Sequence, residues 1–225
     1  QQRAMNAIEL RRFNCWLLYG VTGSGKTEIY LQCIEQVLHA GRQVLVLIPE
    51  ISLTPQTEQR FAERFAVPLV VLHSGLSDKQ RLLAWSRARS GEAKIVLGTR
   101  SAIFTPLAAS GLIVVDEEQD GSYKQQDGFR YSARDLAVMR ARREDIPIIL
   151  GSATPSLESL HNCDLGRYRA LYLNNRAGLA KPAGWQVVDM RNQATPEGIA
   201  SDTLAAIEQT LARSEQVLVF LNRRG

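Results

Sequence analysis

The stretch CWLLYGVTGSGKTEIYLQCIEQVLHAG (residues 15–41) determines the fold expected for this chain. An apolar run leads into a segment that matches G-x-x-x-x-G-K-[ST] in full, and a helical pattern follows and ends at Gly41. Glycines between a strand and a helix let backbone N–H groups surround a phosphate, while the helix N-terminus adds partial positive charge. The stretch therefore predicts a nucleotide-binding loop, and the alternative is an ordinary glycine-rich turn.

The residue types in this loop indicate ATP and Mg²⁺ as cofactors. Lys26 would reach the β- and γ-phosphates, and the hydroxyl of Thr27 would bind the metal ion. The residues expected to contact the nucleotide are Gly20, Thr22, Gly23, Ser24, Gly25, Lys26, Thr27 and Glu28.

Short apolar runs alternate with amphipathic stretches from residue 15 to residue 150. The runs are residues 15–19, 44–48, 68–72, 94–98, 112–115 and 147–150. Near-continuous apolar runs separated by helices are typical of a parallel sheet that is covered on both faces. We therefore expect a doubly wound α/β domain with a mostly parallel sheet.

The alternation weakens after residue 155. We expect a domain over residues 1–160, a connector with short strands over 161–200, and the start of a second α/β lobe over 201–225. That start would consist of a helix at about 202–213 and a strand at 217–221. We expect the chain to be a piece of a longer protein, in which the second lobe is incomplete.

The sequence LIVVDEE (112–118) supplies the acids that a nucleotide loop needs. Asp116, at the end of a buried strand, would hold Mg²⁺ through water, and Glu117 would polarise the attacking water. Two adjacent acids alone indicate only a solvated turn. Their place after four apolar residues and downstream of the loop favours the catalytic interpretation.

Each apolar run ends in a segment rich in Gly, Ser, Thr or charge. The carboxyl ends of parallel strands meet at one edge of a sheet, and that edge binds ligands. Turn chemistry explains any single segment, but all six together predict one shared site.

Aromatic and basic residues alternate in GSYKQQDGFRYSAR (121–134). Rings can stack on exposed bases while cations follow the phosphate backbone. The residues that predict such a nucleic-acid contact are Tyr123, Lys124, Phe129, Arg130 and Tyr131. The alternative is a loop whose aromatic rings only pack on the domain surface.

Composition permits this interpretation without requiring it. The net charge of +4 and the pI near 9.1 give a mild basic bias. Cys15, Cys33 and Cys163 lie far apart, which predicts buried thiols without a zinc site in this chain. No apolar stretch approaches a membrane span, and the first residues lack the apolar core of a secretory signal, so we expect a cytoplasmic protein.

The chain resembles the primosomal replication-restart helicases of superfamily 2 in the order of the segments GVTGSGKTE, PEISLTPQ, LHSGLS, GTRSAIFTP, DEE-D, SYKQQ-G-RY-ARD, ILGSATPS and FLNRRG. The resemblance covers the chain essentially end to end. It implies a RecA-like fold and an ATP-dependent helicase that moves 3′→5′ on single-stranded DNA and acts at stalled forks. It also implies forked DNA, primosome proteins and single-stranded DNA-binding protein as partners, a nucleoid-associated location, and zinc in the complete protein.

The resemblance also assigns roles to residues outside the loop and the acids. It places DNA contacts at Thr54, Thr99, Arg100, Ser101, Asn222 and Arg223. Gly151, Ser152 and Thr154 would couple the ATP site to movement between lobes, and Gln1 would recognise adenine.

Two residues depart from the family pattern, which usually has histidine in place of Gln119 and Ser132. A glutamine can still bind a γ-phosphate or a residue of the GSATPS segment by hydrogen bonds, so we expect Gln119 to retain a catalytic, coupling role.

Other classes remain open from the sequence. One is another superfamily 2 translocase, RecG-like or of the restriction type. The second is a nucleotide-gated scaffold without motor activity, against which Glu117 argues, because a scaffold needs no water-activating acid. We expect the isolated chain to bind nucleotide, to hydrolyse it poorly, and to expose apolar side chains near its end.

Overall fold

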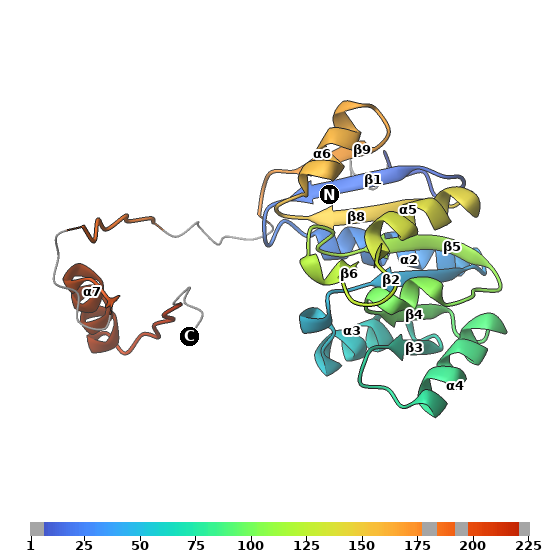
Figure 1. Ribbon diagram of the computed structural model, residues 1–225, viewed down its shortest axis with the longest axis horizontal. Helices are drawn as coiled ribbons and strands as arrows, with labels where there is room; N and C mark the ends of the chain where they lie inside the picture. Colours follow the sequence, from blue (N-terminus) through green and yellow to red (C-terminus); the bar gives the residue numbers. More distant parts are fainter. Residues whose placement is uncertain (1–6, 177–183, 192–197, 221–225) are drawn as a thin grey trace. The chain divides into compact units, whose positions relative to one another are not determined.

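The computed structural model describes residues 7–176, 184–191 and 198–220 (Figure 1). The chain divides into two compact units, Gln1–Ala180 and Lys181–Gly225. The candidate site lies in the first unit.

A seven-stranded sheet forms the centre of the first unit, with strand order β3-β4-β2-β5-β8-β1-β9. Every neighbouring pair is parallel. The strands are β1 (Cys15–Gly20), β2 (Gln43–Leu47), β3 (Leu69–Leu72), β4 (Ile95–Gly98), β5 (Ser110–Val115), β8 (Ile148–Ser152) and β9 (Arg169–Leu173). The predicted doubly wound, parallel α/β fold is confirmed.

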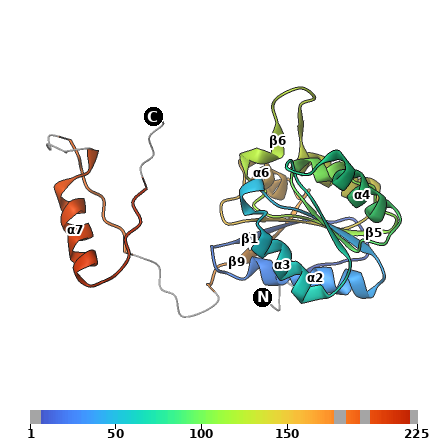
Figure 2. The same ribbon diagram turned by 90° about the horizontal axis from the view of Figure 1, so that it is seen from below.

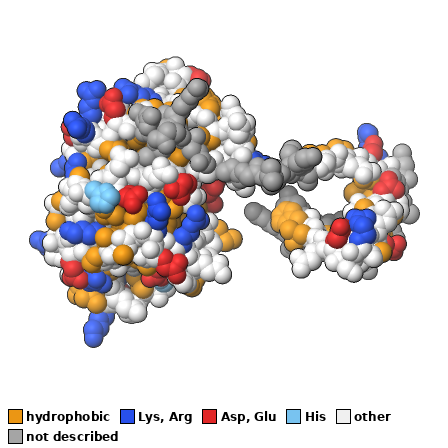
Figure 3. All heavy atoms as spheres, turned by 180° about the vertical axis from the view of Figure 1, so that it is seen from behind, with side chains coloured by type: hydrophobic (Ala, Val, Ile, Leu, Met, Phe, Trp, Pro, Cys, Tyr) orange, Lys and Arg blue, Asp and Glu red, His pale blue; other side chains and the backbone are white. Residues whose placement is uncertain are grey.

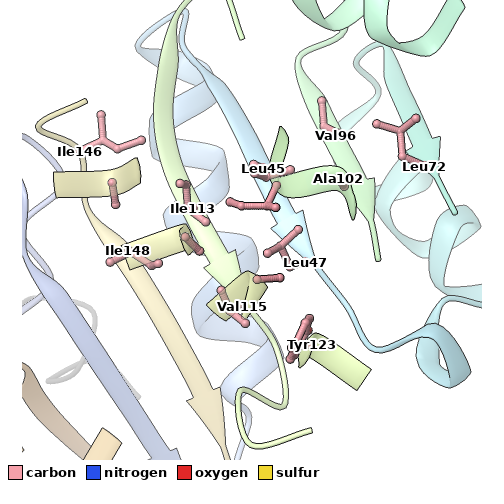
Figure 4. Close-up of a cluster of buried hydrophobic side chains, with 14 of the residues drawn as sticks. Leu45, Leu47, Leu72, Val96, Ala102, Ile113, Val115, Tyr123, Ile146 and Ile148 are labelled. Carbon is pink, nitrogen blue, oxygen red and sulfur yellow. The ribbon is translucent and has the colours of Figure 1, made fainter. Parts of the chain in front are cut away.

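Helices cover both faces of this sheet (Figures 1 and 2). Helices α2 (Lys26–His39) and α3 (Pro55–Phe65) pack on one face. Helices α4 (Asp78–Arg89), α5 (Ala133–Arg143) and α6 (Leu157–Asp164) pack on the other. Successive strand residues point to opposite faces, so Val44 and Val46 join the first core while Leu45 and Leu47 join the second (Figure 4).

Local signals start the helices at the carboxyl edge of the sheet. The side chains of Thr54, Ser77, Ser132 and Ser156 each accept a hydrogen bond from a backbone N–H group in the first turn of the following helix. Ser77 and Gln80 form a reciprocal capping box. These caps hold the loops between strands and helices in defined positions at the edge where the candidate site lies.

Short elements complete this edge. They are the 3₁₀ helices η1 (Glu50–Ser52), η2 (Arg100–Phe104) and η3 (Gly121–Tyr123), and an antiparallel hairpin of β6 (Lys124–Gln125) and β7 (Tyr131–Ser132). Strand β9 lies inside the segment expected to be a connector, and it pairs with β1 as an edge strand.

The second unit contains helix α7 (Ser201–Ala212), where a helix is expected. The prediction of a strand at 217–221 is wrong for residues 217–220, which have no regular secondary structure, and residue 221 lies outside the described residues. A strand forms only when a neighbour accepts its hydrogen bonds. The apolar side chains of this segment are exposed, with Leu218 at 94% and Phe220 at 84%. Within the described parts of the chain, no helix is long and apolar enough to cross a membrane.

Candidate functional site

The loop between β1 and α2 has the backbone shape of an anion cradle. Gly23 (φ 77°) and Gly25 (φ 89°) both adopt left-handed conformations that residues with side chains rarely adopt. At Gly20 a Cβ atom would lie 2.4 Å from the Oγ atom of Ser24, so the strand end is tightly packed against the loop. The Nζ atom of Lys26 donates a hydrogen bond of 2.8 Å to the carbonyl of Gly20, which holds the amine inside the cradle. Thr27 follows it on the first turn of α2 and is half-buried.

Asp116 follows the central strand β5 and reaches the same edge. Its Oδ1 atom accepts a hydrogen bond of 3.1 Å from the hydroxyl of Tyr30, which comes from α2. Burial raises the pKa of Asp116, and the neighbouring charge of Glu117 raises it further, while the Tyr30 hydrogen bond and Lys26 lower it. The hydroxyl of Tyr30 also faces Gly151, where an added Cβ would lie 1.4 Å from that oxygen. Tyr30 therefore connects the loop helix, the acid and β8.

A chain of hydrogen bonds joins the acids to the segment after β8. Glu117 has a left-handed backbone (φ 45°), and its Oε2 atom accepts a hydrogen bond of 2.9 Å from the Nε2 atom of Gln119. The Oε1 atom of Gln119 accepts a hydrogen bond of 2.6 Å from the hydroxyl of Ser152. The Oγ atom of Ser152 in turn accepts one of 2.8 Å from the backbone N–H of Thr154. Gln119 thus bridges Glu117 and Ser152 directly.

Glu118 is not among the predicted site residues, yet it is the most buried of the three adjacent acids, with its side chain 0% exposed. Its Oε2 atom accepts hydrogen bonds from Nη1 of Arg134 (3.2 Å) and from the hydroxyls of Ser156 (3.0 Å) and Ser159 (2.8 Å). Its Oε1 atom accepts a hydrogen bond of 2.7 Å from the backbone N–H of Ser156. This network fixes the acidic loop to α5 and α6. In the sequence, Glu118 is distinguished only as the third acid after an apolar run. Its partners lie 16 to 41 residues further along the chain, so no local pattern indicates the network.

The prediction that Tyr123 stacks on DNA bases is wrong. The residue is 2% exposed, and its ring lies in the core beyond the ends of β2 and β5 (Figure 4). Its hydroxyl donates a hydrogen bond of 2.6 Å to the backbone carbonyl of Asp116. A ring in the core cannot stack on a base. Tyr123 instead holds the backbone of the acidic loop through its hydrogen bond to Asp116.

The other aromatic residues of the predicted nucleic-acid segment lie on the β6–β7 hairpin. Phe129 is 77% exposed, and its ring centroid is 6.0 Å from that of Tyr131. Tyr131 in turn contacts Phe104 of η2 edge to face at 5.1 Å. Lys124 and Arg130 are exposed beside these rings. The hairpin therefore presents rings and cations together to solvent.

The remaining predicted DNA contacts occupy different positions around the edge. Arg100 donates from Nη1 to the carbonyls of Ser122 (3.1 Å) and Lys124 (3.2 Å), which ties η2 to the hairpin. Thr54 caps α3, Thr99 is buried and Ser101 is exposed. On the face shown in Figure 3, basic side chains are interspersed with acidic ones, in keeping with the mild net charge.

The structure thus brings the predicted nucleotide loop, the acids and the GSATPS segment together at the carboxyl edge of β1, β5 and β8. The predictions for Gln1, Asn222 and Arg223 lie outside the described residues.

The family described as DEAD/DEAH box helicase matches residues 1–163, and the chain belongs to this family. It is similar to the replication restart protein PriA of Haemophilus influenzae, with 56% identity over 95% of this chain and 29% of that protein. PriA of Bacillus subtilis is 44% identical over 93% of this chain and 26% of its own length. The predicted resemblance to the replication-restart helicases is therefore confirmed. The chain spans less than a third of either relative.

Solved structures share the fold at lower identity. The helicase domain of Pyrococcus furiosus Hef is 23% identical, with a TM-score of 0.55 over 78% of this chain and 37% of that one. RecG bound to a three-way DNA junction is 22% identical, with a TM-score of 0.55 over 83% of this chain and 24% of that one. These likenesses establish the fold alone.

Proposed function

We propose that this chain is the ATP-binding lobe of a DNA helicase that translocates 3′→5′ and acts in replication restart at stalled forks. The observation that carries the proposal is the continuous set of contacts from the nucleotide loop through Asp116 and Glu117 to Ser152. The names of the similar PriA proteins support the restart role. We propose that this lobe continues past residue 160 through β9, and that residues 201–225 start a second lobe.

The residues of the loop fit ATP and Mg²⁺. Two left-handed glycines leave backbone N–H groups free of side-chain obstruction, and Lys26 already lies inside the cradle. Thr27 and Asp116 would hold the metal ion, with Asp116 oriented by Tyr30. A bound magnesium ion would supply positive charge against the phosphate oxygens.

Glu117 would activate the attacking water, and Gln119 would couple the ATP site to the GSATPS segment. Glu117 would accept a proton from the attacking water, and the amide of Gln119 holds that carboxylate at 2.9 Å. Gln119 also accepts a hydrogen bond from Ser152, so a movement of Glu117 would alter a hydrogen bond of the GSATPS segment.

Single-stranded DNA would cross the edge beside the hairpin. Phe129 and Tyr131 would stack on bases, while Lys124, Arg130 and Ser101 would contact phosphates without reading sequence. Forked DNA, primosome proteins and single-stranded DNA-binding protein are the partners we propose for the complete protein. PriA at 56% identity favours this reading over a RecG-like one.

Fluorescence anisotropy of a labelled single-stranded oligonucleotide tests the proposal. The chain is titrated with and without Mg²⁺ and a non-hydrolysable ATP analogue. We expect binding that weakens with salt and that shifts when nucleotide is added, because Tyr123, directly before the hairpin, is hydrogen-bonded to the backbone carbonyl of Asp116. Lys26→Ala serves as the control and should bind DNA without the nucleotide-dependent shift. Absence of DNA binding in every state would contradict the proposal.

Gln119→Ala should reduce the effect of DNA on nucleotide turnover more than it reduces nucleotide affinity. The substitution removes the bridge between Glu117 and Ser152 but leaves the loop and Lys26 intact. The measurement is DNA-stimulated ATP hydrolysis by the complete protein, together with the affinity for a fluorescent ATP analogue. Equal losses in both quantities would show that Gln119 only helps to build the nucleotide site.

A further inference from the structure

A hollow of about 220 Å³ lies near the outer edge of the sheet, and none of its lining residues belongs to the nucleotide loop or to the acids. It is bounded by the end of β3, by helix α4 and by η2. Its lining residues are Leu72, His73, Arg81, Trp85, Ser101, Ala102 and Phe104. Its volume is below the roughly 300–1,000 Å³ of pockets for drug-sized ligands, so it suits one flat ring system.

Two large aromatic side chains of this hollow remain accessible. Trp85 is 40% exposed and Phe104 is 45% exposed. Exposed aromatic rings are the platforms on which proteins stack the bases of single strands. Arg81 is exposed beside them, and none of the seven lining side chains, all within the described part of the chain, is acidic. The hollow therefore combines ring surfaces with a cation that suits a phosphate.

Phe104 connects this hollow to the hairpin. Its ring contacts Tyr131 at 5.1 Å, and Tyr131 lies 6.0 Å from Phe129. A row of rings thus runs from the exposed hairpin through Tyr131 to Phe104, which lines the hollow together with Trp85. Ser101 belongs both to the predicted DNA-binding segment and to the lining of the hollow.

We infer that the hollow is a base-binding subsite for single-stranded DNA, in which one base stacks on Trp85 and Phe104 and its phosphate contacts Arg81. The inference rests on the proposed function, because it extends the DNA path from the hairpin toward the outer edge strand β3. Stacking on a ring does not discriminate strongly between bases, so the subsite would add affinity without sequence preference.

The test measures the affinity of the chain for a fluorescein-labelled oligothymidine strand by anisotropy. Trp85→Ala should weaken binding roughly 5- to 150-fold, the range that corresponds to loss of one stacked base. Trp85→Phe should retain most of the affinity, because it keeps a ring. Leu82→Ala is the matched control, since Leu82 is 68% exposed on the same helix and does not line the hollow.

A second variant separates the phosphate contact from the stack. Arg81→Gln should reduce the dependence of affinity on salt, because one phosphate contact is lost. Affinity for a fluorescent ATP analogue should stay unchanged in Trp85→Ala and Arg81→Gln, which shows that each variant is folded. If the parent chain binds DNA and Trp85→Ala binds it equally well, the inference is overturned while the proposed function stands. If the parent chain binds no DNA, both are overturned.

Discussion

Replacing Arg134 with methionine is expected to lower the free energy of unfolding by about 3–5 kcal/mol, the usual cost of removing one partner of a buried ion pair. The side chain of Arg134 is 8% exposed and that of its partner Glu118 is 0% exposed. Without Arg134 the carboxylate would stay buried with hydroxyl and backbone N–H donors but no opposite charge. Urea unfolding followed by circular dichroism measures the change.

Two further variants identify the cause. Arg87→Met removes an arginine whose ion pair with Glu92 (2.7 Å) is 34% and 55% exposed, and it should cost at most about 1 kcal/mol. Adding Glu118→Gln to Arg134→Met should recover part of the lost stability, because the amide oxygen still accepts hydrogen bonds from the serines while the unpaired charge is gone. A loss below about 1 kcal/mol for Arg134→Met would refute a structural role for the pair.

Gly151→Ala is expected to destabilise the fold and to weaken binding of nucleotide in the presence of Mg²⁺. The new Cβ would lie 1.4 Å from the hydroxyl oxygen of Tyr30 and 2.5 Å from its Cζ atom. Tyr30 is 3% exposed, so its ring can move only by displacing the core. Overpacking of this kind costs about 1–3 kcal/mol and would pull the hydroxyl away from Asp116.

Unfolding in urea and titration with a fluorescent ATP analogue test the prediction for Gly151. Gly121→Ala is the matched control, because an added Cβ there meets nothing within 4 Å. Tyr30→Phe removes the hydrogen bond to Asp116 without adding a clash. It therefore separates the effect of a misoriented Asp116 carboxylate from the effect of overpacking around Tyr30. If Gly151→Ala is as stable as Gly121→Ala, Tyr30 has room to move and the packing argument is wrong.

The sequence predicted the parallel sheet because its strands are buried on both faces and therefore appear as apolar runs such as residues 44–48 and 112–115. It also indicated which segments meet, since the ends of parallel strands share one edge. The strand predicted at 217–221 shows the limit of this signal. An apolar run indicates that a strand is possible, but pairing depends on a partner elsewhere in the chain.

Individual side chains were harder to predict. Tyr123 and Phe129 belong to the same aromatic and basic segment, yet one is 2% exposed and the other 77%. Alternation of rings and cations does not indicate which ring faces the core. Glu118, Arg134 and Tyr30 escaped prediction because their partners come from distant elements, and such pairings leave no local pattern.

The position of β1 in the sheet has a consequence for how the protein folds during synthesis. Its two neighbours, β8 and β9, are made more than a hundred residues after it, whereas β2, β3, β4 and β5 lie close together along the chain. The β2–β5 half of the sheet can therefore assemble while the ribosome is still translating. The strand that carries the nucleotide loop must wait, with its hydrogen-bonding edges unpaired, until residues 148–173 have emerged. This sheet would thus gain the strand that carries the nucleotide loop last, although that strand precedes the other strands of the sheet along the chain.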